Sequence, residues 1–428
     1  MTFPFNPHPL HSSKDIRAHP LFRGAISRWL WRLGTHRLSR PGVWFAGMTL
    51  AFALYGTTSM DLQVFVPFTY AVSVWLLAWG WAILRPPRVA LAVQHPSRIK
   101  AGGLLPVTVT VQALKRPVFD AVLLPRRLPP AIDAAEEDGI ALGTLRLGAA
   151  QSVTLNLRCT RRGLYALHGY RVQTDFPFGL LRAYMAVPGE RTVLVTPQWT
   201  PLRQMDLPLR RSEQPGGAAL ATARGEALEF MGNREFREGD NIRDMDWRAT
   251  ARLDRLVVRE FHEEYLHRVA LVLDTWAADA PGADAAWEGA VSLCASAGEF
   301  LARQEYPVGV LLAGQAVHVF DAIQPWASHE QTLDILAIVA SSPAPTLSGN
   351  IPGLPEILED VSVVVCFLLD WDDARRAFIE SLYSLGLALR LVLVQAGDPT
   401  LDPTADEARF GPIARVTPEQ VERGLNRL

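Results

Sequence analysis

The chain has 428 residues, of which 49% are apolar, and a formal net charge of −2 at pH 7. This length accommodates two or three domains with full cores, and the near-zero charge gives no support for a nucleic-acid partner. The three cysteines, Cys159, Cys294 and Cys366, lie far apart and suggest neither a disulfide framework nor a zinc site. Walker A and GxGxxG patterns are both absent, so no motif for nucleotide hydrolysis is present.

The first 42 residues form a basic segment in which seven lysines and arginines stand against one acid, Asp15. Within it, residues 21–33 combine arginines with Trp and Leu, a pattern typical of a short interfacial helix. A basic tail without regular structure fits the same composition. Both interpretations of this segment remain open.

Residues 43–84 are almost entirely apolar, with Asp61 as the only ionisable charge. Because about 20 residues span a bilayer core as a helix, this stretch predicts two transmembrane helices, roughly 43–59 and 63–84. A buried hairpin of a soluble protein is the alternative. Arginines flank the stretch on both sides and predict that both ends face the cytoplasm; they are Arg37, Arg40, Arg85 and Arg88.

Short segments in which apolar and polar residues alternate follow over residues 88–200, separated by Gly and Pro turns. The clearest of them are 89–93, 107–114, 152–159 and 170–174. Alternation with period two is the pattern of half-buried strands, and this spacing predicts an immunoglobulin-like β-sandwich. Residues 201–229, rich in Gly and small residues, are expected to form a linker.

The most charged segment of the chain is 230–267. Its seven arginines and its acids nearly balance, and they are interleaved with apolar residues and a turn signal at 238–241. A charged segment that is also tied to a core usually has specified ion pairs.

Over 268–428 apolar strands alternate with helices. The pattern predicts strands at 269–273, 306–312, 316–320, 361–369, 388–394 and 413–416, and helices at 287–303, 329–340, 373–385 and 418–426. Continuous apolar strands that alternate with helices indicate a doubly wound, mostly parallel α/β sheet.

Several motifs carry a family resemblance. They are Arg161-Arg162-Gly163, Asp175-x-Pro177-Phe178-Gly179, Phe236-x-x-Gly239-Asp240-x-x-Arg243-x-x-Asp246-Trp247-x-x-x-Ala251-Arg252, Val258-x-x-Phe261 and Val272-Leu273-Asp274. With the order of hairpin, sandwich and α/β part, the chain resembles the bacterial family called domain of unknown function 58. The resemblance implies an α/β part related to von Willebrand factor A domains. It also implies a partnership with MoxR-type AAA+ ATPases in assembling or maturing other proteins, and a place in the bacterial inner membrane.

The related adhesion domains hold Mg²⁺ through an Asp-x-Ser-x-Ser run, a distant Thr and a distant Asp. Here the run reads Asp274-Thr275-Trp276-Ala277-Ala278, so both serine positions carry groups that cannot bind a metal. Asp274 and Asp370, at the ends of two predicted strands, are the remaining candidate ligands. We expect no cofactor at this edge, with Mg²⁺ as the alternative.

The charged segment admits a docking or structural role and a catalytic one. The docking or structural candidates are Gly239, Asp240, Arg243, Asp246, Trp247, Ala251 and Arg252, with Trp247 expected to pack between the sandwich and the α/β domain. A hydrolase that uses Asp240, Asp244 and Asp246 is the alternative. No nucleophile accompanies these acids, and a nearby arginine keeps each acid ionised.

The sequence therefore predicts a multi-pass membrane protein without enzymatic activity, whose termini and large soluble domains lie in the cytoplasm. These soluble domains are expected to recruit a MoxR-type AAA+ ATPase or its protein client.

Overall fold

The computed structural model describes residues 37–58, 62–136, 138–208, 228–237, 240, 242–263, 268–277, 282–306, 308–313, 316–319, 325–342, 344–345, 347, 353–359 and 361–428. The possible interfacial helix at 21–33 and most of the expected linker lie outside these residues. The chain divides into two compact units: one comprises Met1–Gln198 with Asp334–Val339, and the other comprises Trp199–Leu333 with Ala340–Leu428.

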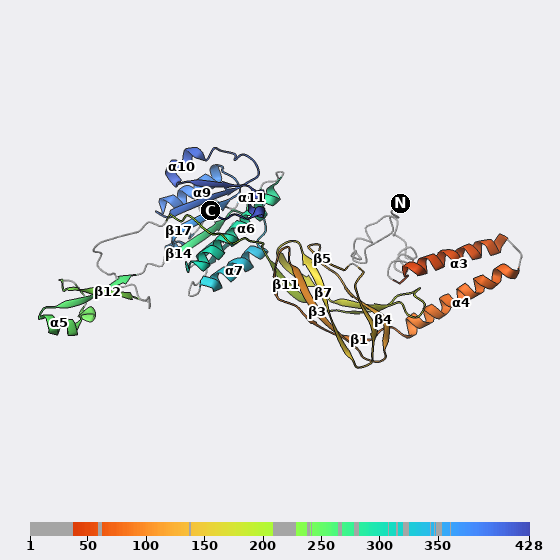
Figure 1. Cartoon of the computed structure of the whole chain (residues 1–428). Coiled ribbons are helices and arrows are strands. Elements are labelled where there is room, and N and C mark those ends of the chain that lie inside the picture. Colours follow the sequence, from red (N-terminus) through yellow and green to blue (C-terminus); the bar gives the residue numbers. More distant parts are fainter. Residues whose placement is uncertain are drawn as a thin grey trace. The chain divides into compact units, whose positions relative to one another are not determined.

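Two helices begin the described part of the first unit: α3, Arg40–Thr58, and α4, Leu62–Leu84. They lie side by side (Figure 1), where Trp75 Nε1 donates to Thr49 Oγ1 at 3.3 Å and the Phe45 and Trp75 ring centroids are 5.9 Å apart. Their outer surface is apolar: Trp44, for example, is 82% exposed. About half of the exposed large apolar side chains in the described part belong to these two helices.

By length and composition, one stretch of the described helices can cross a membrane, Phe65–Leu84 in α4. α3 is shorter, with 19 residues, and includes Arg40 together with glycines and threonines. α3 does not meet these criteria, because its ends are more polar, so of the two predicted spans the described helices support the second.

The strands that follow form a β-sandwich (Figure 1). They are β1 (Val89–Gln94), β2 (Arg98–Lys100), β3 (Leu104–Ala113), β4 (Val118–Pro125), β5 (Ile132–Ala134), β6 (Ile140–Leu145), β7 (Ala150–Cys159), β8 (Gly163–Leu167), β9 (Tyr170–Thr174), β10 (Ala183–Val187) and β11 (Arg191–Thr196). The sheets have the orders β1-β3-β7-β5, β10-β9-β4-β6 and β2-β11-β8. The predicted strands at 89–93, 107–114, 152–159 and 170–174 correspond to β1, β3, β7 and β9.

Alternation in the sequence explains how the sandwich is filled. In β3 every second residue, Leu105, Val107, Val109 and Val111, is fully buried, while the residues between them are more exposed. These side chains meet others from β4, β6, β7 and β9 in one apolar core. A strand with this period buries one face and leaves the other to solvent.

The second unit contains a six-stranded sheet with the order β16-β15-β14-β17-β18-β19. Its strands are β14 (Arg268–Leu273), β15 (Val308–Ala313), β16 (Ala316–Val319), β17 (Val361–Leu368), β18 (Ala388–Val394) and β19 (Ile413–Val416). β16 is antiparallel to β15, and the other neighbours are parallel. The continuous apolar strands predicted a sheet of this kind, because a parallel sheet is buried on both faces.

Helices cover both faces of this sheet. They are α6 (Ala283–Arg303), α8 (Leu354–Ile357), α9 (Asp373–Ser384), α10 (Thr404–Phe410) and α11 (Pro418–Arg423), while α7 (Pro325–Ile338) is divided between the two units. Phe378 of α9 and Phe410 of α10 share a core with Val272 and Leu391. α6 lies on the opposite face, where a Cβ at Gly289 would lie 3.3 Å from Val394 Cγ1. The short helices α8 and α10 were not predicted, because neither is long enough to show a period.

The charged segment forms a small antiparallel pair of strands with a short helix. We call its described residues between Leu228 and Glu263 the signature lobe. It contains β12 (Leu228–Glu235), a 3-10 turn η2 (Ile242–Asp244), α5 (Trp247–Leu253) and β13 (Val257–Glu263). β12 pairs with β13, with an irregularity between Phe230 and Gly232. Its buried apolar side chains are Met245, Ala249, Val257 and Val258.

Candidate functional site

Two acids of the signature lobe hold its fold together, and Asp240 is the first. Its carboxylate accepts two hydrogen bonds from the Arg234 guanidinium, at 2.7 and 2.8 Å, and one from the Arg237 backbone N–H at 2.7 Å. The hydrogen bonds from Arg234, followed by that from Arg237, lower the pKa of Asp240 to about 2. This carboxylate is therefore ionised and joins β12 to the turn that follows it through hydrogen bonds.

Asp246 is the second structural acid, at the N-cap of α5. Its Oδ1 accepts from the backbone N–H groups of Arg248 and Ala249, at 3.0 and 2.9 Å. Asn233 of β12 donates to Oδ2 at 3.2 Å. The bond from Ala249 is the main cause that lowers the pKa of Asp246. One side chain thus starts the helix and ties it to the strand pair.

Replacing the N-cap tests this role. In Asp246→Ala the first turn of α5 loses its acceptor, so hydrogen exchange of the α5 amides should become severalfold faster. Asp246→Asn keeps an acceptor oxygen and should exchange almost as the unchanged protein does. Equal exchange in the two variants would show that the cap does not order α5.

The low pKa of Asp240 also predicts a pH dependence. An unfolded Asp titrates near 3.9, about two units above the folded group. The stabilisation is therefore complete above about pH 4 and is lost as the pH falls toward 2. Hydrogen exchange of the β12–β13 amides, corrected for its intrinsic pH dependence, should show this loss. The Asp240→Asn variant should show little of it, and an equal loss in both proteins would contradict this role of Asp240.

The other candidates of the signature lobe lie on its surface. Trp247, the first residue of α5, is 61% exposed, and the expected packing of this side chain between two domains stays a prediction. Arg243, Ala251 and Arg252 are also exposed. Gly239 and the side chain of Asp244 lie outside the described residues. The sequence motif thus contains two kinds of residue. Its acids stabilise the lobe, whereas its tryptophan and arginines are exposed on the surface.

Exposed apolar residues lie beside Trp247 in the sequence. Ile242 in η2, Leu253 at the end of α5, and Leu256 just before β13 are all exposed. Arg248 and Arg252 are one helical turn apart and share a side of α5. We call the exposed side chains of Ile242, Trp247, Arg248, Arg252, Leu253 and Leu256 the lobe face.

Asp274 lies at the carboxyl end of β14, as predicted, but an arginine already occupies its carboxylate. Arg375 of α9 donates from Nε to Asp274 Oδ2 at 2.6 Å and from Nη2 to the Trp276 carbonyl at 2.7 Å. Its Nη1 donates to Asp372. The guanidinium Cζ lies 4.4 Å from the centroid of the Trp276 ring. Every arm of this buried cation therefore has a partner.

The Asp274 carboxylate is saturated as well. The backbone N–H groups of Trp276 and Leu369 donate to it at 3.0 and 3.1 Å. Burial raises the pKa of Asp274, while Arg375 and these hydrogen bonds act in the opposite direction. A carboxylate with this set of donors is a structural anchor between β14, β17 and α9.

Asp370 follows β17, next to β14, but its carboxylate is engaged elsewhere. The Thr400 backbone N–H donates to Oδ1 at 2.9 Å, and the Thr400 hydroxyl donates to Oδ2 at 2.5 Å. Asp274 and Asp370 thus lie on adjacent strands without sharing a partner. Among the residues that the structure describes, no group of three His, Cys, Asp or Glu side chains could hold a metal ion.

The donor set at this edge does not fit the Mg²⁺ of an adhesion domain. A divalent cation needs free carboxylate and hydroxyl oxygens. Here one oxygen of Asp274 accepts from a guanidinium and the other from a backbone N–H group, and the next position of the ligand run is Trp276. Arg375 was missed in the sequence because it lies 101 positions from Asp274. The available signal was an acid at the end of a buried strand, which needs a counter-charge.

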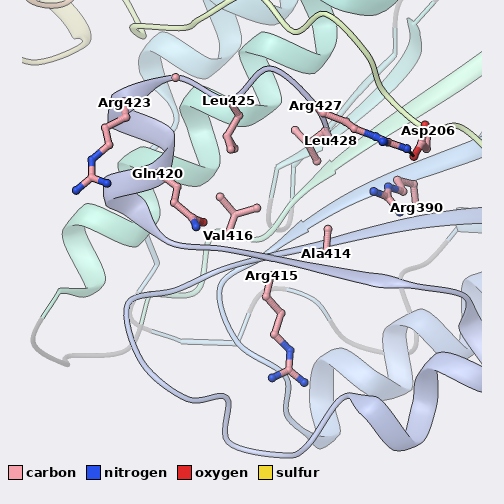
Figure 2. A pocket seen from close by; sticks show the side chains of 11 residues that line it. Asp206, Arg390, Ala414, Arg415, Val416, Gln420, Arg423, Leu425, Arg427 and Leu428 are labelled. Atoms are coloured by element: carbon pink, nitrogen blue, oxygen red, sulfur yellow. Dashed lines mark hydrogen bonds and ion pairs between the residues drawn. The ribbon is translucent and has the colours of Figure 1, made fainter.

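A cavity of about 570 Å³ lies beside β18, β19 and α11. In Figure 2, Arg427 extends toward Asp206 with Arg390 beside the pair, while Arg415 and Arg423 extend away from it. Arg427 and Asp206 form an ion pair at 2.9 Å. The lining contains no Ser, Thr, Cys or His, so the cavity offers no nucleophile with a base.

Comparison with known proteins places the signature lobe in a family. The model of the family described as protein of unknown function DUF58 matches residues 232–378. This segment of the chain is similar to the DUF58 family. The matched segment contains both the signature lobe from Gly232 onward and the Asp274–Arg375 pair, so the resemblance read from the sequence is confirmed.

One DUF58 relative among curated proteins is the uncharacterized protein YeaD of Bacillus subtilis (strain 168). It is 23% identical over 306 residues, which cover 69% of this chain and 75% of YeaD. Among solved structures, a fragment of native alpha-2-macroglobulin from Escherichia coli is 15% identical, with a TM-score of 0.20. That match covers 27% of this chain and 17% of the fragment, too little to bear on the fold of this chain.

Proposed function

We propose that this DUF58 protein is a membrane-anchored docking protein without catalytic activity, and that the lobe face is the surface that binds its partner. One observation carries the proposal. The signature lobe uses Asp240 and Asp246 to build itself and leaves Trp247, Arg248 and Arg252 on its surface. A small lobe has few large apolar side chains with which to build a core. A tryptophan that stays exposed beside arginines therefore favours a binding role.

The residue types of the lobe face suit protein–protein contact. Tryptophan and arginine are enriched among the residues that dominate binding energy, because they combine large apolar area with fixed hydrogen-bond donors. The exposed arginines fit an acidic surface on the partner. The family resemblance makes a MoxR-type AAA+ ATPase, or the client protein of such an ATPase, the partner we propose.

The anchor we propose consists of α3 and α4. The apolar exposed surface of both helices supports it, as does the length of Phe65–Leu84. In this proposal α3 is the second span, and Arg40 lies at the headgroup level. Both termini and the large domains then lie on the cytoplasmic side of a bacterial inner membrane.

A likeness of the α/β unit to von Willebrand factor A domains also belongs to the proposal. The parallel sheet with helices on both faces supports it. In this unit Arg375 takes the place of the metal, so the edge carries no open cation for a partner's carboxylate. We therefore place the docking surface on the signature lobe rather than at the carboxyl ends of the strands.

The hydrolase alternative has no observation in its favour. A general acid or base works best with a pKa near the operating pH. Asp240 has a pKa of about 2, and the pKa of Asp246 is also lowered, so both carboxylates stay ionised and bonded to arginine and backbone groups.

Two measurements test the proposal. After expression of the full chain, an alkaline carbonate wash should leave it in the membrane fraction, and release by the wash would disprove the anchor. The purified full-length protein should bind a purified MoxR-type AAA+ ATPase from the same organism. Absence of binding, with the chain intact in detergent or lipid discs, would disprove the partner.

A further inference from the structure

One end of the β-sandwich is joined to the helices α3 and α4. Four segments of chain gather there: residues 85–88 after α4, the β3–β4 turn at 114–117, the β6–β7 turn at 146–149, and the β9–β10 connection at 175–182. We call them the proximal turns.

α3 is fastened to the proximal turns through its first residues. Ser39 N donates to the Leu180 carbonyl at 3.1 Å, and Ser39 Oγ donates to the Gly179 carbonyl. Arg182 N donates to the Arg37 carbonyl at 2.6 Å. A Cβ at position 42 would lie 2.2 Å from the Leu180 oxygen, so only glycine permits this approach.

α4 meets the same loop at its last turn. The Trp81 ring packs edge-on against Phe176 at 5.9 Å between centroids, and Phe176 packs against Phe119 of β4 at 4.8 Å. The Arg85 guanidinium lies over Trp81 at 4.4 Å. Tryptophan and arginine at the end of an apolar helix mark the headgroup level of a bilayer. The loop that touches them lies at this same level.

The other two turns reach the same end through β3. Leu114 N donates to the Arg88 carbonyl at 2.9 Å, which joins the β3–β4 turn to the segment after α4. Leu147 bridges Ala113, the last residue of β3, and Gly148 N donates to the Ala113 carbonyl at 3.2 Å. The residues of these turns therefore lie close to the end of α4.

This end of the sandwich displays apolar and basic side chains together. Leu114, Phe119, Leu147 and Phe178 are all exposed. The basic residues here outnumber the acids Asp120 and Asp175; they are Arg37, Arg40, Arg85, Arg88, Lys115, Arg116, Arg146 and Arg182. Single exposed apolar residues are ordinary, but one in each of three turns amid a strong excess of positive charge is the composition of a lipid-binding surface.

We propose that the proximal turns form a second, peripheral membrane contact that binds the headgroups of anionic phospholipids. The exposed apolar side chains enter the headgroup layer, and the basic side chains pair with lipid phosphates. The contacts between the helix ends and the proximal turns fix the sandwich close to the bilayer, so that it does not move freely on a flexible linker. This inference rests on the proposed membrane anchor and adds the lipid class and the surface that binds it.

Single-cysteine labelling of the full chain tests the proposal. Leu147→Cys places a nitrobenzoxadiazole fluorophore in a proximal turn, at a position that is 57% exposed. Leu104→Cys is the matched control, 51% exposed at the opposite end of β3. The native cysteines are buried, and burial raises the pKa of each thiol, so they should not react.

In vesicles that contain phosphatidylglycerol, a quencher carried on shallow acyl carbons should quench the label at position 147. Aqueous iodide should quench that label severalfold less than the label at position 104. The protection should fall in phosphatidylcholine vesicles and at high salt. Lys115→Glu with Arg116→Glu should weaken it further, since each basic residue at an anionic surface contributes about fivefold.

Equal access of iodide to both labels, in a chain that resists alkaline extraction, would overturn this inference and leave the anchor standing. Protection at position 147 in native membranes but not in pure lipid would also overturn it, because a protein would then cover the turns. A chain that washes out of the vesicles would overturn the anchor and this inference together.

Discussion

Replacing Asp274 with alanine is expected to destabilise the C-terminal α/β unit by about 3–5 kcal/mol, the cost of leaving one charge of a buried pair uncompensated. The Arg375 side chain is 4% exposed and donates to Asp274 at 2.6 Å. Without that carboxylate, the guanidinium keeps Asp372 and the Trp276 carbonyl but stays buried with too few acceptors. Hydrogen exchange of the β14 and β17 amides measures the loss.

Two further variants show whether the pair itself is responsible. Removing both charges, as Asp274→Leu with Arg375→Met, should recover part of the stability, since no buried guanidinium remains while Asp372 loses its cation. Asp370→Asn is the matched control at the neighbouring strand end. It keeps an acceptor oxygen for the Thr400 backbone N–H, and its amide N–H can donate to the Thr400 hydroxyl, so the stability should change by less than about 1 kcal/mol. Equal losses for Asp274→Ala and Asp370→Asn would contradict the anchor.

The same variant tests the metal. If Arg375 stands in place of Mg²⁺, calorimetry of the intact protein with Mg²⁺ or Mn²⁺ should show no binding that Asp274→Ala removes. A clear one-to-one binding that disappears in Asp274→Ala would overturn the assignment of Asp274 as a structural anchor.

Trp247→Ala is expected to weaken binding of the MoxR-type AAA+ ATPase about 30-fold, which corresponds to about 2 kcal/mol at a binding hot spot. Trp247 is 61% exposed in the described structure, so its removal should change the stability of the signature lobe by less than about 0.5 kcal/mol. The dissociation constant for the purified ATPase and hydrogen exchange of the β12–β13 amides measure the two effects separately.

Arg252→Ala should weaken the same binding about tenfold, and more at low salt than at high salt. Tyr383→Ala removes an exposed aromatic side chain outside the signature lobe and should leave the affinity unchanged. If Tyr383→Ala and Trp247→Ala reduce the affinity equally, or if Trp247→Ala unfolds the lobe, the lobe face is not the docking surface.

The periodic segments of the chain determined most of its architecture in advance. Alternation over residues 107–114 predicted a half-buried strand, and the apolar run at 361–369 predicted a strand buried on both faces. Both inferences succeed because burial leaves a local pattern in the sequence. Burial of one face of a strand gives alternation, and burial of both faces gives a continuous apolar run. The short helices α5, α8 and α10 were not predicted, because one or two turns of helix are too short to show a hydrophobic period.

The candidate sites likewise divide into features visible within one stretch of sequence and features that depend on tertiary contacts. The motif of the signature lobe was visible in the sequence, since its residues lie within one short stretch. Tertiary contacts decided which of these side chains stabilise the lobe and which are exposed on its surface. One such contact joins Asn233 of β12 to Asp246 at the N-cap of α5. Trp247 is the example: an aromatic residue in a charged segment fits a core and a docking surface equally well.

The sequence alone determined the order of the parts, the strand patterns and the presence of Trp276 and Ala278, rather than serines, after Asp274. Tertiary structure decided which group pairs with the Asp274 carboxylate, because Arg375 reaches Asp274 only after β14, β17 and α9 have packed. It likewise decided which turns gather at the ends of α3 and α4. Patterns of burial are local in the sequence, whereas pairing of a buried charge is a property of the folded chain, and no stretch of sequence by itself contains both partners.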